Sequence, residues 1–233
     1  MRIVIVDLLE AAPPFDVLPS AGTLIEQWLA PSMPDATFKT IPVARGAGLP
    51  MLADFDGLLV SGSEKGVYDH VPWMADLRTL LLQTQTARKP IYGICFGHQV
   101  MADTFGGKAE KVSDPVIGLC ALKTDDTQID GYLWHQDQVT QVPPKATVTM
   151  SASHCPVAAL SYDFPAMSVQ SHPEFTEQDF MDLIETATGS ILTPDEAKAV
   201  AQGMTRPAAA TELANEAADF FRRHCARDLS RTA

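Results

Sequence analysis

Residues 93–99 of the chain read Gly93-Ile94-Cys95-Phe96-Gly97-His98-Gln99 and continue directly from the apolar residues Ile91 and Tyr92. A small residue two positions before the cysteine and a glycine two positions after it permit a sharp turn from a strand into a helix. In an α/β sheet, such a turn raises the cysteine above the carboxyl edge of the sheet and next to a helix N-terminus. The stretch therefore predicts a buried strand over residues 90–94 and a helix over residues 97–105.

Further apolar runs, over residues 3–6, 38–43 and 56–63, have the pattern of short strands, and residues 23–29 and 73–87 have helical spacing. Alternation of strands with helices predicts an α/β fold, doubly wound and flavodoxin-like, with a mostly parallel sheet and helices on both faces. Residues 108–123, 147–151 and 157–162 predict extra short strands in the middle third. The chain after Glu174 predicts a helical C-terminal tail.

We expect one domain, because no linker, repeat or low-complexity tract interrupts the chain. Residues 1–175 are predicted to form its core, and residues 176–233 a helical extension packed on the same domain. Within that extension, residues 193–196 read Thr-Pro-Asp-Glu. This is a capping box with proline at the first helical position, and it predicts a helix start there.

The composition excludes several classes of partner and site. A formal net charge of -12 and a pI of about 4.8 disfavour binding to nucleic acid or to anionic membranes. The four cysteines are far apart and lack C-x-x-C spacing, so neither a disulfide framework nor a zinc site is expected. No apolar run approaches the roughly 18 residues of a membrane span, and Asp7 comes too early for a signal peptide. We expect a cytoplasmic protein.

The predicted position of Cys95 favours chemistry at its sulfur. The dipole and free N–H groups of a helix N-terminus stabilise a thiolate, which is the nucleophilic form of cysteine. The N–H of Phe96 would point toward an oxyanion formed at a carbonyl that Cys95 attacks. From the spacing alone, a buried cysteine on a glycine-flanked turn is an equally good interpretation. For the neighbouring His98 we expect a helix-surface or packing role.

A candidate base lies at His172, in the segment Gln170-Ser171-His172-Pro173-Glu174. Residues two apart in an extended segment face the same side, so His172 and Glu174 can converge. A solvated turn explains this short segment about as well. Taken together with the cysteine elbow, however, it supplies the base and the orienting carboxylate that a thiol nucleophile needs.

The loop over residues 60–69 leaves the carboxyl end of a predicted strand at the same sheet edge as Cys95. Its backbone N–H groups, Ser63 in particular, could supply a second oxyanion donor. As a phosphate-binding loop it lacks the required spacing. An ordinary strand-to-helix loop is the alternative interpretation, and without the other two segments it is the preferred one.

Together these segments resemble the class I, triad-type glutamine amidotransferase family. Its G-x-C-x-G-x-Q motif is similar to residues 93–99, its H-P-E motif to residues 172–174, and its S-G-G/S…V-Y-D loop to residues 61–69. Residues 134–139 resemble the H-x-D-x-V segment near the family's glutamine pocket. The resemblance covers residues 1–175, and the free-standing GMP-synthase-like members look most similar. Many members have glycine and then proline where this chain has Ser63 and Glu64.

The resemblance implies hydrolysis of the side-chain amide of glutamine through a thioester, with no metal or organic cofactor. The residues implied are Cys95, His172 and Glu174 for catalysis, Ser63 and Phe96 for the oxyanion hole, and Gly62, Gln99, His135 and Asp137 for binding the small-molecule substrate. Two alternatives stay open. The triad could cleave γ-glutamyl peptides or amides, or the chain could be a subunit that is active only with a synthase partner that accepts ammonia.

Overall fold

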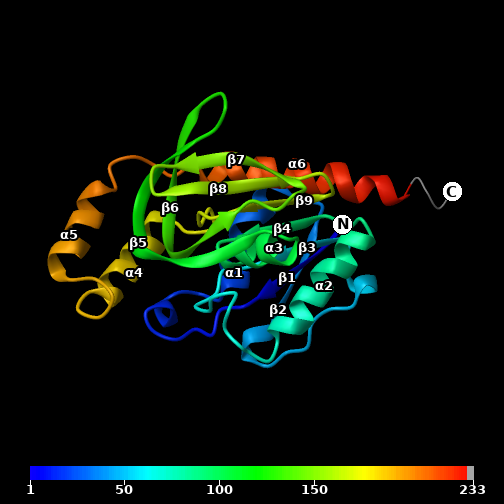
Figure 1. The fold of residues 1–233 in the computed structure, drawn as a ribbon, viewed down its shortest axis with the longest axis horizontal. Coiled ribbons are helices and arrows are strands. Elements are labelled where there is room, and N and C mark those ends of the chain that lie inside the picture. Colours follow the sequence, from blue (N-terminus) through cyan, green and yellow to red (C-terminus); the bar gives the residue numbers. More distant parts are fainter. Residues whose placement is uncertain (230–233) are drawn as a thin grey trace.

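The computed structural model describes the backbone of residues 1–229 and the side chains of residues 1–225. Strands β1 to β9 form one sheet in the order β2-β1-β3-β4-β9-β8-β7-β5-β6 (Figure 1). The parallel part consists of β2 (Thr37–Pro42), β1 (Arg2–Asp7), β3 (Gly57–Val60), β4 (Ile91–Ile94) and β9 (Ala166–Val169). The antiparallel part consists of β8 (Cys155–Tyr162), β7 (Ala146–Ala152), β5 (Lys108–Lys123) and β6 (Gln128–Gln141).

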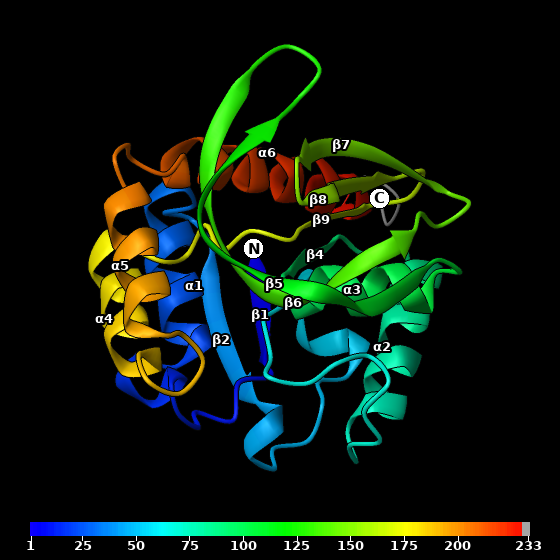
Figure 2. The same ribbon diagram turned by 60° about the vertical axis from the view of Figure 1, so that its left-hand side comes forward.

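Helices cover both faces of the parallel part, which confirms the predicted fold class in the form of a mixed nine-stranded sheet. Helices α2 (Met74–Thr86) and α3 (Phe96–Thr104) pack on one face, and α1 (Ala21–Leu29) and α6 (Ala210–Leu229) on the other (Figure 2). Successive side chains of β1 point to opposite faces of the sheet. Val4 and Val6 belong to the apolar cluster on one face, and Ile3 and Ile5 belong to the cluster on the other. This alternation is the period of two expected of a strand that is buried on both faces.

The middle third departs from the sequence analysis in length. Strand β5 contains 16 residues and β6 contains 14, so the extra strands predicted as short include the longest in the chain. They form a hairpin whose register shifts between Lys111 and Val116, and one end of which projects from the molecule in Figure 2. Strand β6, which the sequence analysis did not identify, carries residues 134–139 along the sheet edge.

The C-terminal part is helical, as predicted. Helix α4 (Glu177–Ala187) begins with a capping box at Thr176, and α5 (Pro194–Gly203) begins with the expected one at Thr193. Helix α6 contributes Phe220 and Phe221 to the core, with ring centroids 6.5 and 6.4 Å from that of Tyr92. The boundary at residue 175 stays a prediction, and residues 230–233 of the predicted extension lie outside the described residues.

Four short 3-10 helices occupy loops of the first quarter of the chain: η1 (Phe15–Val17), η2 (Ala30–Ser32), η3 (Val43–Arg45) and η4 (Leu52–Asp54). The first of them, η1, lies in the loop that follows β1, at the carboxyl edge of the sheet. Among the described residues, none of the helices combines the length and apolar character that crossing a membrane requires.

Candidate functional site

Cys95 occupies a sharp elbow between β4 and α3. Its backbone has φ 52° and ψ -104°, a conformation that costs a non-glycine residue free energy and that nucleophile elbows characteristically adopt. Glycines make the turn possible. A Cβ atom on Gly97 would lie 2.3 Å from the carbonyl oxygen of Val60, and one on Gly93 would lie 2.7 Å from the backbone of Gly97. Helix α3 therefore starts in direct backbone contact with β3.

His172 follows the end of β9 at the same sheet edge. Its backbone N–H donates to the carbonyl oxygen of Tyr132 at 2.8 Å, which fixes the segment against β6. Its ring stacks on that of Phe175 at a centroid distance of 4.4 Å with the planes 1° apart. The Nδ1 donates to Oε1 of Glu174 at 2.8 Å. Both partners are buried, so the ring has little freedom to rotate.

The imidazole of His172 also contacts Cys95. Burial by itself would lower the pKa of His172, but the negative charges of Cys95 and Glu174, and hydrogen bonds to both, raise that pKa to about 10. Because Nδ1 is engaged by Glu174, Nε2 is the nitrogen that serves Cys95. A Cβ on Gly62 would lie 3.2 Å from Cε1 of His172 and 3.7 Å from Cβ of Cys95, so all three segments converge here.

The two candidate oxyanion donors lie beside the elbow. Phe96 is the first residue of α3, where backbone N–H groups have no acceptor within the helix. Ser63 follows β3 and lines the pocket in front of Cys95. The loop of Ser63 is tied to the elbow, since the N–H of Gly97 donates to the carbonyl oxygen of Ser61 at 3.1 Å. Ser63 and Phe96 thus belong to two different segments, the loop after β3 and the start of α3, that lie side by side next to Cys95.

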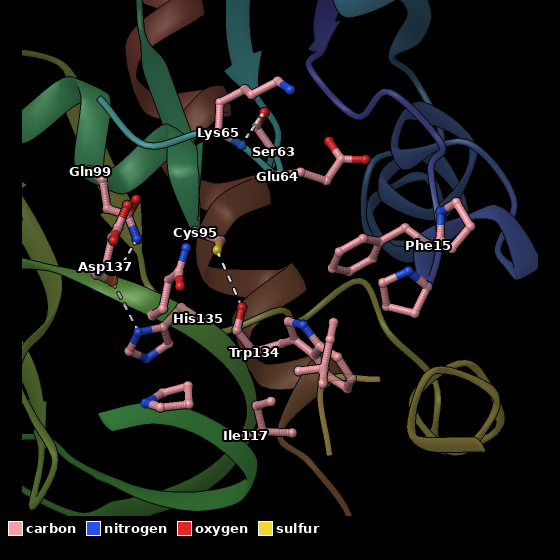
Figure 3. A pocket seen from close by; sticks show the side chains of 15 residues that line it. Phe15, Ser63, Glu64, Lys65, Cys95, Gln99, Ile117, Trp134, His135 and Asp137 are labelled. Carbon is pink, nitrogen blue, oxygen red and sulfur yellow. Dashed lines mark hydrogen bonds between the residues drawn. The ribbon is translucent and has the colours of Figure 1, made fainter. Parts of the chain in front are cut away.

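A network of polar groups borders the other side of Cys95. The Nε2 of Gln99 donates to the carbonyl oxygen of Asp137 at 2.8 Å, and Nδ1 of His135 donates to the same oxygen at 3.0 Å. The carboxylate of Asp137 accepts from the hydroxyl of Tyr68 at 3.1 Å. Three residues implied by the family resemblance, Gln99, His135 and Asp137, are therefore joined around one carbonyl oxygen (Figure 3).

Burial sets the protonation of this network. It lowers the pKa of His135 to about 4, assisted by the charge of His172, so His135 is neutral at physiological pH. It raises the pKa of Asp137, which the hydroxyl of Tyr68 partly offsets. It also raises the pKa of Tyr68 to about 12, together with the charge of Asp137. The Nε2 of neutral His135 is a buried acceptor without a hydrogen-bond partner among the described residues.

Gln170 is a site residue that the sequence analysis missed. Its side chain is fully buried, and Nε2 donates to Sγ of Cys95 at 3.5 Å while Oε1 accepts from Gln99 at 3.2 Å. The same alternation that paired His172 with Glu174 also places Gln170, two residues earlier, on that side. This signal was present in the sequence.

His98, by contrast, has the packing role expected of it. The imidazole is fully buried, with Nδ1 2.8 Å from Oγ of Ser168 and Nε2 3.1 Å from the carbonyl oxygen of Val157. Burial lowers the pKa of His98 to about 3, so the ring is neutral.

A pocket of about 330 Å³ opens in front of Cys95. Its polar side carries Gln99, His135 and Asp137, and Figure 3 shows Phe15 on the opposite side of the sulfur and Ile117 below it. The remaining lining residues are Pro13, Pro14, Ser63, Glu64, Lys65, Pro115, Trp134, Gln136 and Ile191. Across residues 1–225, no three His, Cys, Asp or Glu side chains are grouped so that they could hold a metal ion.

Several known proteins are similar to this chain. γ-Glutamyl peptidase 3 of Arabidopsis thaliana is 27% identical over 150 residues, which are 58% of this chain and 60% of the peptidase. The glutamine-hydrolysing GMP synthase of Azoarcus sp. (strain BH72) is 33% identical over 138 residues, which are 52% of this chain and 26% of the synthase. The chain thus matches less than two thirds of the length of these relatives.

Solved structures share the fold over almost the whole chain. The glutamine amidotransferase of Methylobacillus flagellatus has a TM-score of 0.73 at 19% identity, covering 97% of this chain and 94% of its own. The glutamine amidotransferase of Thermotoga maritima has a TM-score of 0.74 at 16% identity, covering 96% of this chain and 97% of its own.

The family model described as glutamine amidotransferase class-I matches residues 35–187, which is more than half of the chain. This range contains the cysteine elbow, the loop that follows β3 and the segment with His172 and Glu174. The chain therefore belongs to the class I glutamine amidotransferase family.

Proposed function

We propose that the chain is a cysteine amidohydrolase that cleaves the side-chain amide of glutamine or of a related γ-glutamyl compound. The observation that carries the proposal is the convergence of Cys95, His172 and Glu174 at one sheet edge, where His172 interacts with Cys95 on one side and is hydrogen-bonded to Glu174 on the other. A nucleophile, a base and an orienting group in this order activate a thiol for acyl transfer. We assign the roles of nucleophile, base and orienting group accordingly.

In the first half-reaction, Sγ of Cys95 attacks the carboxamide carbon and forms a carbon–sulfur bond. The N–H groups of Phe96 and Ser63 stabilise the oxyanion, and one such donor contributes on the order of 3 kcal/mol in comparable sites. His172 then gives the proton on Nε2 to the leaving nitrogen as the carbon–nitrogen bond breaks. Ammonia departs, and a γ-glutamyl thioester remains on Cys95.

In the second half-reaction, Nε2 of His172 takes a proton from water while the water oxygen attacks the thioester carbonyl. The carbon–sulfur bond breaks, glutamate leaves, and the thiolate of Cys95 is restored. Glu174 holds the imidazole in one orientation and stabilises its protonated form. These steps require neither a metal ion nor an organic cofactor.

The polar side of the pocket supports binding of the glutamyl group. His135, which is neutral, and the carboxylate of Asp137 both line this side of the pocket, and together they present a polar, negatively charged surface that suits an α-ammonium group. Gln99 would position the glutamyl chain between these groups and Cys95. Gly62 would leave room for the substrate carbonyl, since any side chain there would crowd Cys95 and His172.

A second candidate function is hydrolysis of γ-glutamyl peptides or amides by the same steps. It is favoured by the similarity to γ-glutamyl peptidases and by the pocket that continues past Cys95. The similarity to GMP synthases supports a third candidate function, in which a separate synthase partner accepts the ammonia.

We propose that the protein is located in the cytoplasm, as the sequence analysis predicts.

The experiment that tests the proposal measures ammonia and released amine from glutamine, glutathione and simple γ-glutamyl amides. We expect turnover by the wild type and none by Cys95→Ala, whose melting temperature should stay within a few degrees of the wild-type value. Addition of a candidate synthase should raise turnover sharply if the partner is required. Amide hydrolysis by Cys95→Ala at the wild-type rate would refute the proposal.

A further inference from the structure

The pocket has an apolar side that hydrolysis of glutamine does not use. Its apolar residues come from separate segments: Phe15 from η1, Ile117 from β5, Trp134 from β6 and Ile191 from the loop between α4 and α5. Ammonia is the leaving group of glutamine, and it would fill none of this space. Figure 3 shows Phe15 and Trp134 on the side of Cys95 that faces away from Gln99 and Asp137, with Ile117 below them.

The aromatic part of this apolar side is fixed by packing. The ring of Trp134 meets Phe15 edge-on at a centroid distance of 5.9 Å and Phe180 of α4 at 5.8 Å. Trp134 is 8% exposed and lines the pocket, so these contacts hold it in place there. Ile191 is 49% exposed and is one of the few large apolar side chains so open to solvent among the described residues. Because Ile191 lines the pocket, its exposed side chain is available to contact a ligand.

Glu64 gives the apolar side one polar feature. Its Oε2 accepts from the N–H of Glu10 at 3.0 Å, whereas its Oε1 is buried and has no hydrogen-bond partner among the described residues. The ammonium group of Lys65 pairs with Glu10 at 2.9 Å. Because Glu64 lines the pocket, its negative charge would repel a ligand carboxylate and would favour a ligand N–H or ammonium group.

We propose that the apolar side is a leaving-group subsite for γ-glutamyl amides of apolar amines that carry no carboxylate. The inference rests on the proposed function, since the glutamyl group must occupy the polar side with its carbonyl at Cys95. The amine part then extends over Phe15, Trp134 and Ile191, and Glu64 selects against amino acids as leaving groups. Binding energy gained away from the reacting bond can raise the rate of cleavage as well as affinity.

The test compares kcat/KM for γ-glutamyl methylamide, γ-glutamyl phenethylamide and γ-glutamyl phenylalanine. Burial of a phenyl ring is expected to favour the phenethylamide over the methylamide by about tenfold or more. The carboxylate of γ-glutamyl phenylalanine should reduce that advantage at least about tenfold. Phe15→Ala and Ile191→Ala should each lower the preference for phenethylamide over methylamide, and Glu64→Gln should raise the rate for γ-glutamyl phenylalanine relative to phenethylamide.

Met51→Ala is the matched control, because Met51 is also an exposed apolar residue but does not line the pocket. It should leave the ratio of the two amide rates unchanged. Equal rates for phenethylamide and methylamide, or a preference that survives both Phe15→Ala and Ile191→Ala, would overturn the subsite while leaving the proposed function standing. Absence of turnover with all three compounds and with glutamine would overturn both.

Discussion

Nδ1 of His172 lies 2.8 Å from Oε1 of Glu174, and both side chains are buried. The carboxylate thereby fixes which nitrogen of the ring faces Cys95. The carboxylate also lies close enough to stabilise the protonated imidazole. Burial lowers the pKa of His172, but Cys95 and Glu174 together raise it to about 10. One contact therefore controls both the orientation and the charge of the proposed base.

Glu174→Gln keeps the shape of this contact but removes its charge. The pKa of His172 is raised on folding, so the stability it contributes is complete below about pH 6.5 and is lost as pH rises through about 10. We expect the variant to lose about 1–3 kcal/mol of unfolding free energy near pH 6 and clearly less above about pH 10. Chemical denaturation of both proteins across this range measures the difference. A loss that is independent of pH would contradict the charge interaction.

His98 predicts a loss of stability in acid. Its ring is neutral in the fold, with a pKa lowered to about 3, whereas in the unfolded chain it takes up a proton near pH 6.5. Stability is therefore complete above about pH 6.5 and falls by up to about 1.4 kcal/mol per pH unit below it. His98→Gln should be less stable at pH 7 but should lack this part of the acid dependence. Identical slopes of unfolding free energy against pH would contradict the prediction.

Gly97→Ala tests the backbone contact at the elbow. The added Cβ would lie 2.3 Å from the carbonyl oxygen of Val60, which belongs to the backbone and cannot move aside. We expect the free energy of unfolding to fall by about 1–3 kcal/mol and amide hydrolysis to fall with it. Gly48→Ala is the control, since a Cβ at Gly48 meets nothing within 4 Å. Thermal melts that give the two variants equal stability would be inconsistent with this packing.

Gln170→Leu tests the residue that joins Cys95 to Gln99. The substitution removes the donor to Sγ of Cys95 at 3.5 Å and the acceptor for Gln99 at 3.2 Å, while the volume of the side chain stays similar. A hydrogen bond to a charged group is worth about 1.5–3 kcal/mol, so kcat/KM should fall about 10- to 100-fold. Steady-state kinetics with glutamine measures the change, and an unaltered kcat/KM would remove Gln170 from the site.

Local signals explain why the elbow and the parallel strands could be predicted. The close approach of α3 to β3 requires Gly97, and the strands buried on both faces have short runs of branched apolar residues. Strand β6 lacked such a signal, because buried polar residues, His135, Asp137 and Gln138, interrupt its apolar pattern. These polar residues are stabilised by hydrogen bonds that depend on the tertiary structure.

The apolar side of the pocket could not be predicted for a related reason. Phe15 and Ile191 lie in loops separated by most of the chain, and each is unremarkable in its own segment. The two residues come together because η1 and the loop after α4 border the same pocket as Trp134. Trp134 belongs to β6, a strand that was itself not predicted. Motifs locate the proposed reacting groups, whereas the residues that shape the rest of the pocket come together only in the fold.

The proposed chemistry depends on Cys95 forming a covalent bond to the glutamyl carbonyl. Rapid acid quenching of the wild type during turnover of glutamine, followed by peptide mass spectrometry, detects that bond. We predict one glutamyl group attached to the peptide containing Cys95, none on those with Cys120, Cys155 or Cys225, and none anywhere in Cys95→Ala. A glutamyl group on another cysteine, or full turnover without any adduct on Cys95 when the quench is fast enough to trap one, would contradict the account.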